Sequence, residues 1–170
     1  MNLILTSAKG LEARASAEFK ELALLSGIRK VGIERSAYDG VIEADVENPR
    51  ALLKFLADYV KSEPFRIRFI LRALPIDAVV DTKMKDITAA VKRLSSAIGQ
   101  GETFRITIET RDSPYSTKEL IDAIADVIDK KVDLESPKKV VLVQVFGEYT
   151  GISVLAPEEI LSVVKLKRGS

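Results

Sequence analysis

The chain has 170 residues, of which 46% are hydrophobic and 30% are charged, and its formal net charge is +1. This length predicts one large domain or two small ones, and the balanced charge excludes a protein that attracts polyanions through bulk basicity. The absence of cysteine and histidine excludes disulfides and thiol chemistry, and it removes the usual general base and the commonest zinc ligand. A polyanion site would need positive charge gathered on one face.

The amino terminus, MNLILTSAKG, lacks the basic region that precedes the apolar stretch of a signal peptide. No apolar run in the sequence reaches the length of a membrane-spanning helix. We therefore expect a cytoplasmic protein without membrane contacts.

The first half of the chain alternates between strand and helix patterns. The expected elements are a strand at residues 3–8, a helix at about 11–25, strands at 28–35 and 40–47 joined by a turn, a helix that begins at Asn48-Pro49 and ends at Pro64, and a strand in FRIRFILRALP from Phe65. Asparagine followed by proline is a typical helix start. The order strand, helix, strand, strand, helix, strand is the ferredoxin-like split βαβ pattern. We predict a ferredoxin-like domain over residues 1–74.

The second half begins after Pro75, and we place the boundary near Leu74 to Asp77. The expected elements are an amphipathic helix at 84–98, a strand from Phe104, a helix capped by Ser116 or Thr117 that runs to about Lys131, strands at 140–146 and 149–155, and an ambiguous tail from Pro157. The run from Val140 to Phe146 is apolar on both faces, as is typical of a central strand. We predict a second α/β domain over residues 75–170.

Arginines alternate with apolar residues in FRIRFILR. Strand geometry would put Arg66, Arg68 and Arg72 on one face. Like charges on one sheet face repel, so these residues either pair with acids of adjacent strands, such as Glu43 or Asp45, or face phosphates, which arginine binds in a bidentate manner. The sequence leaves both interpretations open.

The strand FRITIETR ends in Arg111 and leads through RDSPYSTKE into a helix. The junction between a strand end and a helix start binds anions in α/β folds, because free backbone N–H groups point outward. Arg111, Ser116, Thr117 and Lys118 belong to this junction, and Tyr115 offers a ring on which a base could stack. For any one of these residues alone, an ordinary capped helix is the alternative.

The stretch KKVDLESPKK places Lys130, Lys131, Lys138 and Lys139 around one loop between a helix and an apolar strand. Solubility at a loop would explain these four charges. A basic surface for a polyanion is the other interpretation.

Thr103 to Leu155 resembles a THUMP domain, an RNA-binding module of tRNA-modifying proteins. The resemblance is carried by the Phe-initiated strand that ends in Arg111, the capped helix, the Val-Asp-Leu stretch with its Ser-Pro step, and the final strand with Gly151. FRIRFILRALPID resembles the segment that precedes THUMP in the stand-alone adaptor of tRNA cytidine acetylation. Ser136 stands where the family commonly has asparagine, and Ala125 where relatives often carry glycine.

The resemblance implies an α/β (α+β) protein with an amino-terminal ferredoxin-like domain followed by a THUMP domain. It also implies binding of the tRNA acceptor end with its single-stranded CCA terminus, in tRNA modification that yields acetylcytidine. The candidate RNA-binding residues are Arg72, Lys83, Lys85, Arg111, Tyr115, Lys118, Lys130, Lys131, Ser136, Lys138 and Lys139. We expect charge reversal at Arg111, Lys118, Lys138 or Lys139 to weaken tRNA binding and leave the fold intact.

We expect no catalytic activity, no cofactor and no metal. THUMP proteins with catalysis carry it in an extra domain, for which 170 residues leave no room, and no P-loop or glycine-rich dinucleotide turn occurs. Asp122, Asp126 and Asp129 lie at helical spacing, which indicates the solvent-exposed face of a helix.

The function expected is a monomeric adaptor that presents tRNA to a separate enzyme, a cytidine acetyltransferase. A small-molecule sensor built from ferredoxin-like units is the alternative, and it would need a concave apolar pocket. A detached RNA-binding piece of an enzyme, completed by a partner chain, is a third possibility.

Overall fold

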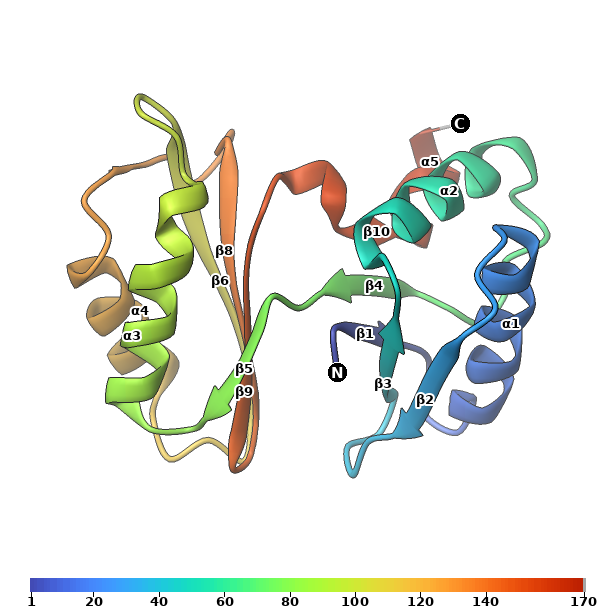
Figure 1. The fold of residues 1–170 in the computed structure, drawn as a ribbon, viewed down its shortest axis with the longest axis horizontal. Helices are drawn as coiled ribbons and strands as arrows, with labels where there is room; N and C mark the ends of the chain where they lie inside the picture. The colour runs from blue at the N-terminus through green and yellow to red at the C-terminus, as the bar shows by residue number, and fades with distance from the viewer. Residues whose placement is uncertain (170) are drawn as a thin grey trace. The chain divides into compact units, whose positions relative to one another are not determined.

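The computed structural model describes residues 1–169, which form two compact units, each built on its own five-stranded sheet (Figure 1). Unit 1 contains Met1–Pro75 together with the segment from Glu159 onward, and unit 2 contains Ile76–Glu158. Helices and antiparallel or mixed sheets are combined in both units, so the predicted α+β fold class is confirmed.

Unit 1 has the strand order β10-β4-β1-β3-β2, and all neighbouring strands are antiparallel. Its elements are β1 (Leu3–Thr6), α1 (Glu12–Leu25), β2 (Val31–Arg35), β3 (Val41–Val46), α2 (Pro49–Ser62), β4 (Arg72–Pro75), β10 (Leu161–Ser162) and α5 (Val163–Gly169). The side chain of Asn48 accepts the Ala51 N–H at 3.2 Å and Pro49 is the first helical residue, as predicted for the start of α2. Strands β4, β1, β3 and β2 alone form the ferredoxin-like sheet.

The prediction of a strand from Phe65 to Leu71 is wrong, because a side chain from α1 binds this stretch of backbone. The Glu18 carboxylate accepts the N–H groups of Arg68 at 2.8 Å, Phe69 at 3.0 Å and Ile70 at 2.9 Å. Three consecutive N–H groups that turn toward one carboxylate cannot alternate between two neighbouring strands. Strand β4 begins only at Arg72.

The expected row of arginines therefore does not form. Arg66 and Arg68 lie in the loop before β4, and within residues 1–169 neither makes an ion pair. Asp45, one of their expected partners, instead pairs with the Met1 ammonium at 3.0 Å.

The tail from Glu159 onward joins unit 1, although the sequence prediction placed it with the second domain. Strand β10 pairs with β4, and the buried side chains of Leu161 and Val163 complete the core of unit 1. Arg50 and Glu159 form an ion pair at 2.5 Å that holds the start of this segment. The assignment of residues 1–74 and 75–170 to two family domains stays a prediction.

Unit 2 has the strand order β5-β9-β8-β6-β7. Its elements are β5 (Ala78–Asp81), α3 (Met84–Leu94), η1 (Ser95–Ala97), β6 (Thr103–Arg111), α4 (Thr117–Asp126), β7 (Lys131–Val132), β8 (Lys139–Phe146), β9 (Tyr149–Leu155) and η2 (Pro157–Glu159), the last of which reaches the start of the tail. Strand β8 pairs in parallel with β6 and antiparallel with β9. It is central and buried from Val140 to Phe146, which confirms the prediction.

Helices α3 and α4 pack together on one face of this sheet (Figure 1). Their buried residues, such as Val91 and Ile124, share a cluster with the alternate residues Val141, Val143 and Val145 of β8. Because side chains of a strand alternate between faces, one face of the sheet is covered by helices. The predicted site residues of unit 2 lie at and beside the two ends of β6 and β8.

Within residues 1–169, no helix is long and apolar enough to cross a membrane. The same residues include no group of three or more His, Cys, Asp or Glu side chains placed to hold a metal ion.

Candidate nucleic-acid interface

The structure separates the predicted RNA-binding residues of unit 2 into two clusters at opposite ends of the sheet. Strands β6 and β8 run in parallel, with Phe104 beside Lys139 at one end and Arg111 beside Phe146 at the other. At about 3.3 Å per residue, these two ends of β6 lie about 23 Å apart. The amino-end cluster comprises Lys130, Lys131, Ser136, Lys138 and Lys139, and the carboxyl-end cluster comprises Lys83, Lys85, Arg111, Tyr115 and Lys118. Arg72 belongs to neither, since it lies in β4 of unit 1.

Two helix starts meet at the carboxyl-end cluster. Helix α4 begins with the predicted cap: the Ser116 hydroxyl accepts the Glu119 N–H at 3.1 Å, and the Glu119 carboxylate accepts the Ser116 N–H at 3.2 Å. Helix α3 has no side-chain cap from Lys83, but the Tyr115 hydroxyl accepts the Met84 N–H at 3.0 Å. This bond joins the two helix starts, whose positive dipole ends favour an anion.

The hydrogen bond to α3 gives Tyr115 a structural contact, and its role as a stacking surface for a base stays a prediction. Its side chain also packs against the core cluster of unit 2. We expect Tyr115→Phe to lower the free energy of unfolding by about 1 kcal/mol, because a capping acceptor is lost while the ring stays. Denaturant unfolding measures the change. tRNA affinity should stay the same, and a loss of affinity without a loss of stability would show that the hydroxyl binds RNA directly.

Arg111 supports the structure of the carboxyl-end cluster, contrary to the prediction that it supports none of it. One guanidinium nitrogen donates to Gln144 Oε1 at 3.1 Å, the other lies 3.5 Å from Glu109, and the guanidinium carbon lies 4.7 Å from the centre of the Phe146 ring. Only 20% of the side chain is exposed. Charge reversal at Arg111 would therefore disturb the fold as well as any RNA contact.

The lysines of the carboxyl-end cluster differ in their availability. Lys118 pairs with Asp122 at 2.6 Å, and this hydrogen bond raises the pKa of Lys118. Lys83 and Lys85 are exposed and make no ion pair within residues 1–169. These two carry positive charge without an ion-pair partner in the described residues, beside the start of α3.

The loop of the amino-end cluster is held by a turn around Asp133. The Asp133 carboxylate accepts the N–H groups of Ser136 at 3.0 Å and Glu135 at 3.1 Å, and these bonds lower the pKa of Asp133. Ser136 thus contributes its backbone N–H to the turn. Arg105, absent from the predicted site, donates to the Leu134 carbonyl at 3.2 Å and ties the loop to β6.

Three of the four lysines in this cluster are accessible. Lys130, Lys131 and Lys138 are exposed and form no ion pair in the described part of the chain. Lys139 is different, because its ammonium lies 3.2 Å from Glu102. The Gly99 N–H, and then Lys139, lower the pKa of the Glu102 carboxyl. The role of all these residues in RNA binding stays a prediction.

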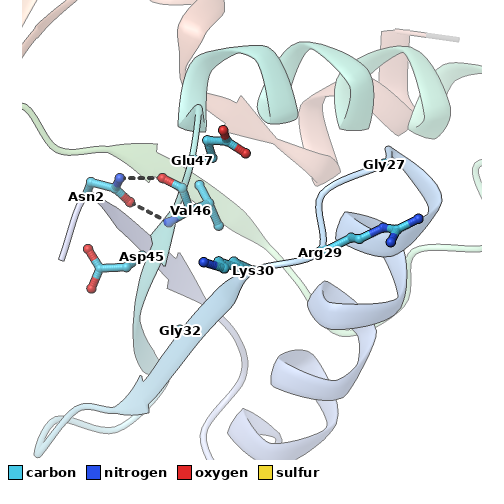
Figure 2. A pocket seen from close by; sticks show the side chains of 8 residues that line it. All are labelled: Asn2, Gly27, Arg29, Lys30, Gly32, Asp45, Val46 and Glu47. Carbon is cyan, nitrogen blue, oxygen red and sulfur yellow. Dashed lines mark hydrogen bonds between the residues drawn. The ribbon is translucent and has the colours of Figure 1, made fainter.

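Unit 1 has hollows that the sequence did not indicate. One, of about 740 Å³, lies between the loop after α1 and the end of β3 and is lined by Asn2, Gly27, Arg29, Lys30, Gly32, Asp45, Val46 and Glu47 (Figure 2). The Asn2 amide is bound to the Val46 backbone at 2.7 and 3.0 Å, and Asp45 is bound to the amino terminus. The other charged side chains of the lining are of both signs, and Arg29 and Lys30 extend in opposite directions from their loop (Figure 2).

A second hollow, of about 580 Å³, lies between α1 and the loop before β4, and its lining includes Arg14, Tyr59, Phe65 and Arg68. The sequence did not reveal it because the loop was predicted as a strand. The available signal in the sequence was that aromatic and arginine residues directly follow a proline.

The family model of the THUMP domain matches residues 81–155. No curated protein matches the chain in sequence. Among solved structures, a protein of Pyrococcus horikoshii (PH1313) is similar with a TM-score of 0.68 and 14% identity, covering 91% of this chain and 54% of that one. TrmN from Thermus thermophilus is similar with a TM-score of 0.56 and 19% identity, covering 91% and 45%.

A 4-thiouridine synthetase, solved as an RNA complex with bound ATP, is similar with a TM-score of 0.52 and 16% identity, covering 95% of this chain and 42% of that one. The chain thus spans about half the length of the solved structures it resembles. At these identities the likeness shows a shared fold.

Proposed function

We propose that the chain binds the acceptor end of tRNA, including its CCA terminus, and presents it to a separate modifying enzyme, because residues 81–155 match the family model of the THUMP domain. A cytidine acetyltransferase is the enzyme proposed, in keeping with the resemblance of FRIRFILRALPID to the segment before THUMP in the acetylation adaptor. The protein acts as a cytoplasmic monomer and leaves the chemistry to its partner.

The observation that carries this proposal is the grouping of exposed lysines at the two ends of the unit 2 sheet, in a chain with a net charge of +1. Lys83, Lys85, Lys130, Lys131 and Lys138 are exposed without ion pairs in the described residues, and all belong to the two clusters of unit 2. Lysines placed in this way neutralise phosphates and release counterions.

The separation of the clusters favours a polynucleotide over a small anion. About 23 Å of strand lies between them at the usual rise per residue, so one nucleotide cannot touch both. A paired RNA stem offers phosphates over such a span, and an unpaired end can be read through exposed bases. The RNA complex of the structurally similar 4-thiouridine synthetase supports this ligand class.

The sensor alternative has less support. The hollow of about 740 Å³ in unit 1 is large enough for a small molecule, but such sites use a few polar groups that converge on the ligand. Here the amide of Asn2 and the carboxylate of Asp45 already have partners within the protein.

Titration of tRNA at increasing salt tests the proposal. With five lysine contacts, the slope of log affinity against log salt should be about −4. tRNA that lacks CCA should bind more weakly than intact tRNA, while its salt slope changes little. An affinity that does not depend on salt, or equal affinity for a nucleotide metabolite, would favour the sensor.

A further inference from the structure

The hollow of about 580 Å³ in unit 1 is a groove between the side of α1 and the loop before β4. Phe65, which lines it, is 89% exposed. Leu25, also in the lining, is 59% exposed. Apolar side chains gathered with this exposure are typical of an interaction surface.

The groove is held in shape by contacts within unit 1. Glu18 fixes the backbone of Arg68, Phe69 and Ile70 through its carboxylate. Tyr59, which α2 contributes to the lining, is stacked on Phe55 with ring centres 6.1 Å apart. A surface that is already ordered loses little conformational entropy when a partner binds.

Positive charge surrounds the apolar groups of this groove. Arg14, Arg66 and Arg68 are exposed in its lining, and within residues 1–169 none of them has an ion pair. The Arg14 guanidinium lies over the Phe69 ring at 5.7 Å. Of the two acids in the lining, Glu18 is bound by backbone N–H groups and Glu21 is exposed. A ligand with carboxylates would complement the guanidinium groups.

We propose that this groove binds an acidic, amphipathic segment of a partner protein. Arginine and aromatic residues are the side chains enriched at the energetic centres of protein interfaces. The exposed side chains of Phe65 and Leu25 match apolar side chains better than they match the sugars and phosphates of RNA. An amphipathic helix that lays its apolar face in a groove is a known mode of such recognition. This inference rests on the proposed function in one respect: the partner is the modifying enzyme that receives the tRNA.

The experiment uses the full chain, the purified acetyltransferase as the probe, and a fluorescent tRNA. The test variant is Phe65→Ser with Arg66→Glu, and the matched control is Val164→Ser with Arg29→Glu, two exposed positions of unit 1 outside the groove. The test variant should bind the enzyme at least tenfold more weakly than the wild type. Its tRNA affinity should stay within twofold, and the control should match the wild type in both measurements.

Four outcomes would overturn the proposal. If the test and control variants bind the enzyme with equal affinity, the groove is not the docking site. Normal tRNA binding by both variants would then show that the proposed RNA recognition does not depend on the groove. A loss of affinity for tRNA or for single-stranded RNA in the test variant would make the groove an RNA site. Self-association of the wild type that the test variant abolishes would make the occupant a second copy. Failure of the wild type to bind the enzyme while it binds tRNA would remove both the adaptor role and this docking site.

Discussion

Reversing the charges of Lys130, Lys131 and Lys138 together should weaken tRNA binding by at least about a hundredfold. Each lost phosphate contact costs roughly 1 kcal/mol in a partly wet site, and about 1.4 kcal/mol corresponds to a factor of ten in affinity. Three contacts thus account for about two orders of magnitude, and the repulsion of the new carboxylates adds to them. The melting temperature should fall only slightly, because all three side chains are exposed and make no ion pair in the described residues. Lys131 and Lys138 interact electrostatically with Asp133 and Glu102, and solvent screens these interactions. Titration at constant salt and a melting curve measure the two effects.

A control variant with three other lysines reversed distinguishes the loss of local phosphate contacts from the effect of net charge. Lys20, Lys54 and Lys61 are exposed lysines of unit 1, and reversing them changes the net charge by the same amount. This control should lose no more than a fewfold of affinity at physiological salt, where charges beyond about 8 Å are screened. If both triples weaken binding equally, the amino-end cluster contributes only to the overall field. If neither does, the cluster serves solubility and the RNA site lies elsewhere.

Replacing Gly40 by alanine should lower the free energy of unfolding by about 3 kcal/mol. Gly40 has a φ of +70°, and a Cβ at this position would lie 2.6 Å from the backbone oxygen of Ser7. A left-handed conformation costs a residue with a Cβ about 1–2 kcal/mol, and a clash with backbone adds about 1–3 kcal/mol. The Gly40 N–H also donates to the buried Glu12 carboxylate at 2.7 Å, a bond that lowers the pKa of Glu12 and that a backbone shift would disturb.

Gly10→Ala is the matched control for this prediction. Gly10 has a φ of +87°, but nothing lies within 4 Å of a Cβ built there. Gly10→Ala should therefore lower the free energy of unfolding only by the conformational cost, about 1 kcal/mol. Denaturant unfolding of both variants gives the difference, and an equal effect would mean that the backbone of Ser7 moves aside without cost.

Local patterns were sufficient to predict most elements of the fold. Asn48-Pro49 begins α2 and Ser116 caps α4, because a cap needs only residues within a turn of each other. The apolar run from Val140 to Phe146 predicted a central strand, since burial on both faces leaves no polar alternation. The resemblance to the THUMP domain could likewise be seen from Thr103 to Leu155, within residues 81–155 that the family model matches.

Sequence patterns were insufficient where distant residues decide the local structure. FRIRFILR alternates like a strand, but Glu18, some fifty residues earlier, binds its backbone and turns it into a loop. The tail joins unit 1 because Leu161 pairs with Ala73 in the sheet and lies buried in that core. Neither contact leaves a signal within a short window of sequence.

The candidate site also combines features that the sequence predicted with features that only the tertiary structure decided. Composition and spacing identified the lysines around the loop at residues 130–139 and the arginine at the end of β6. Only the parallel register of β6 and β8 placed Lys139 and Arg111 at opposite ends of the sheet. Only packing made Arg111 a structural residue, through Gln144 and Phe146, while Lys138 stayed exposed. A side chain's type and its neighbours along the chain are present in the sequence, whereas its partners across the sheet arise when the strands pair, because pairing joins residues far apart in the chain.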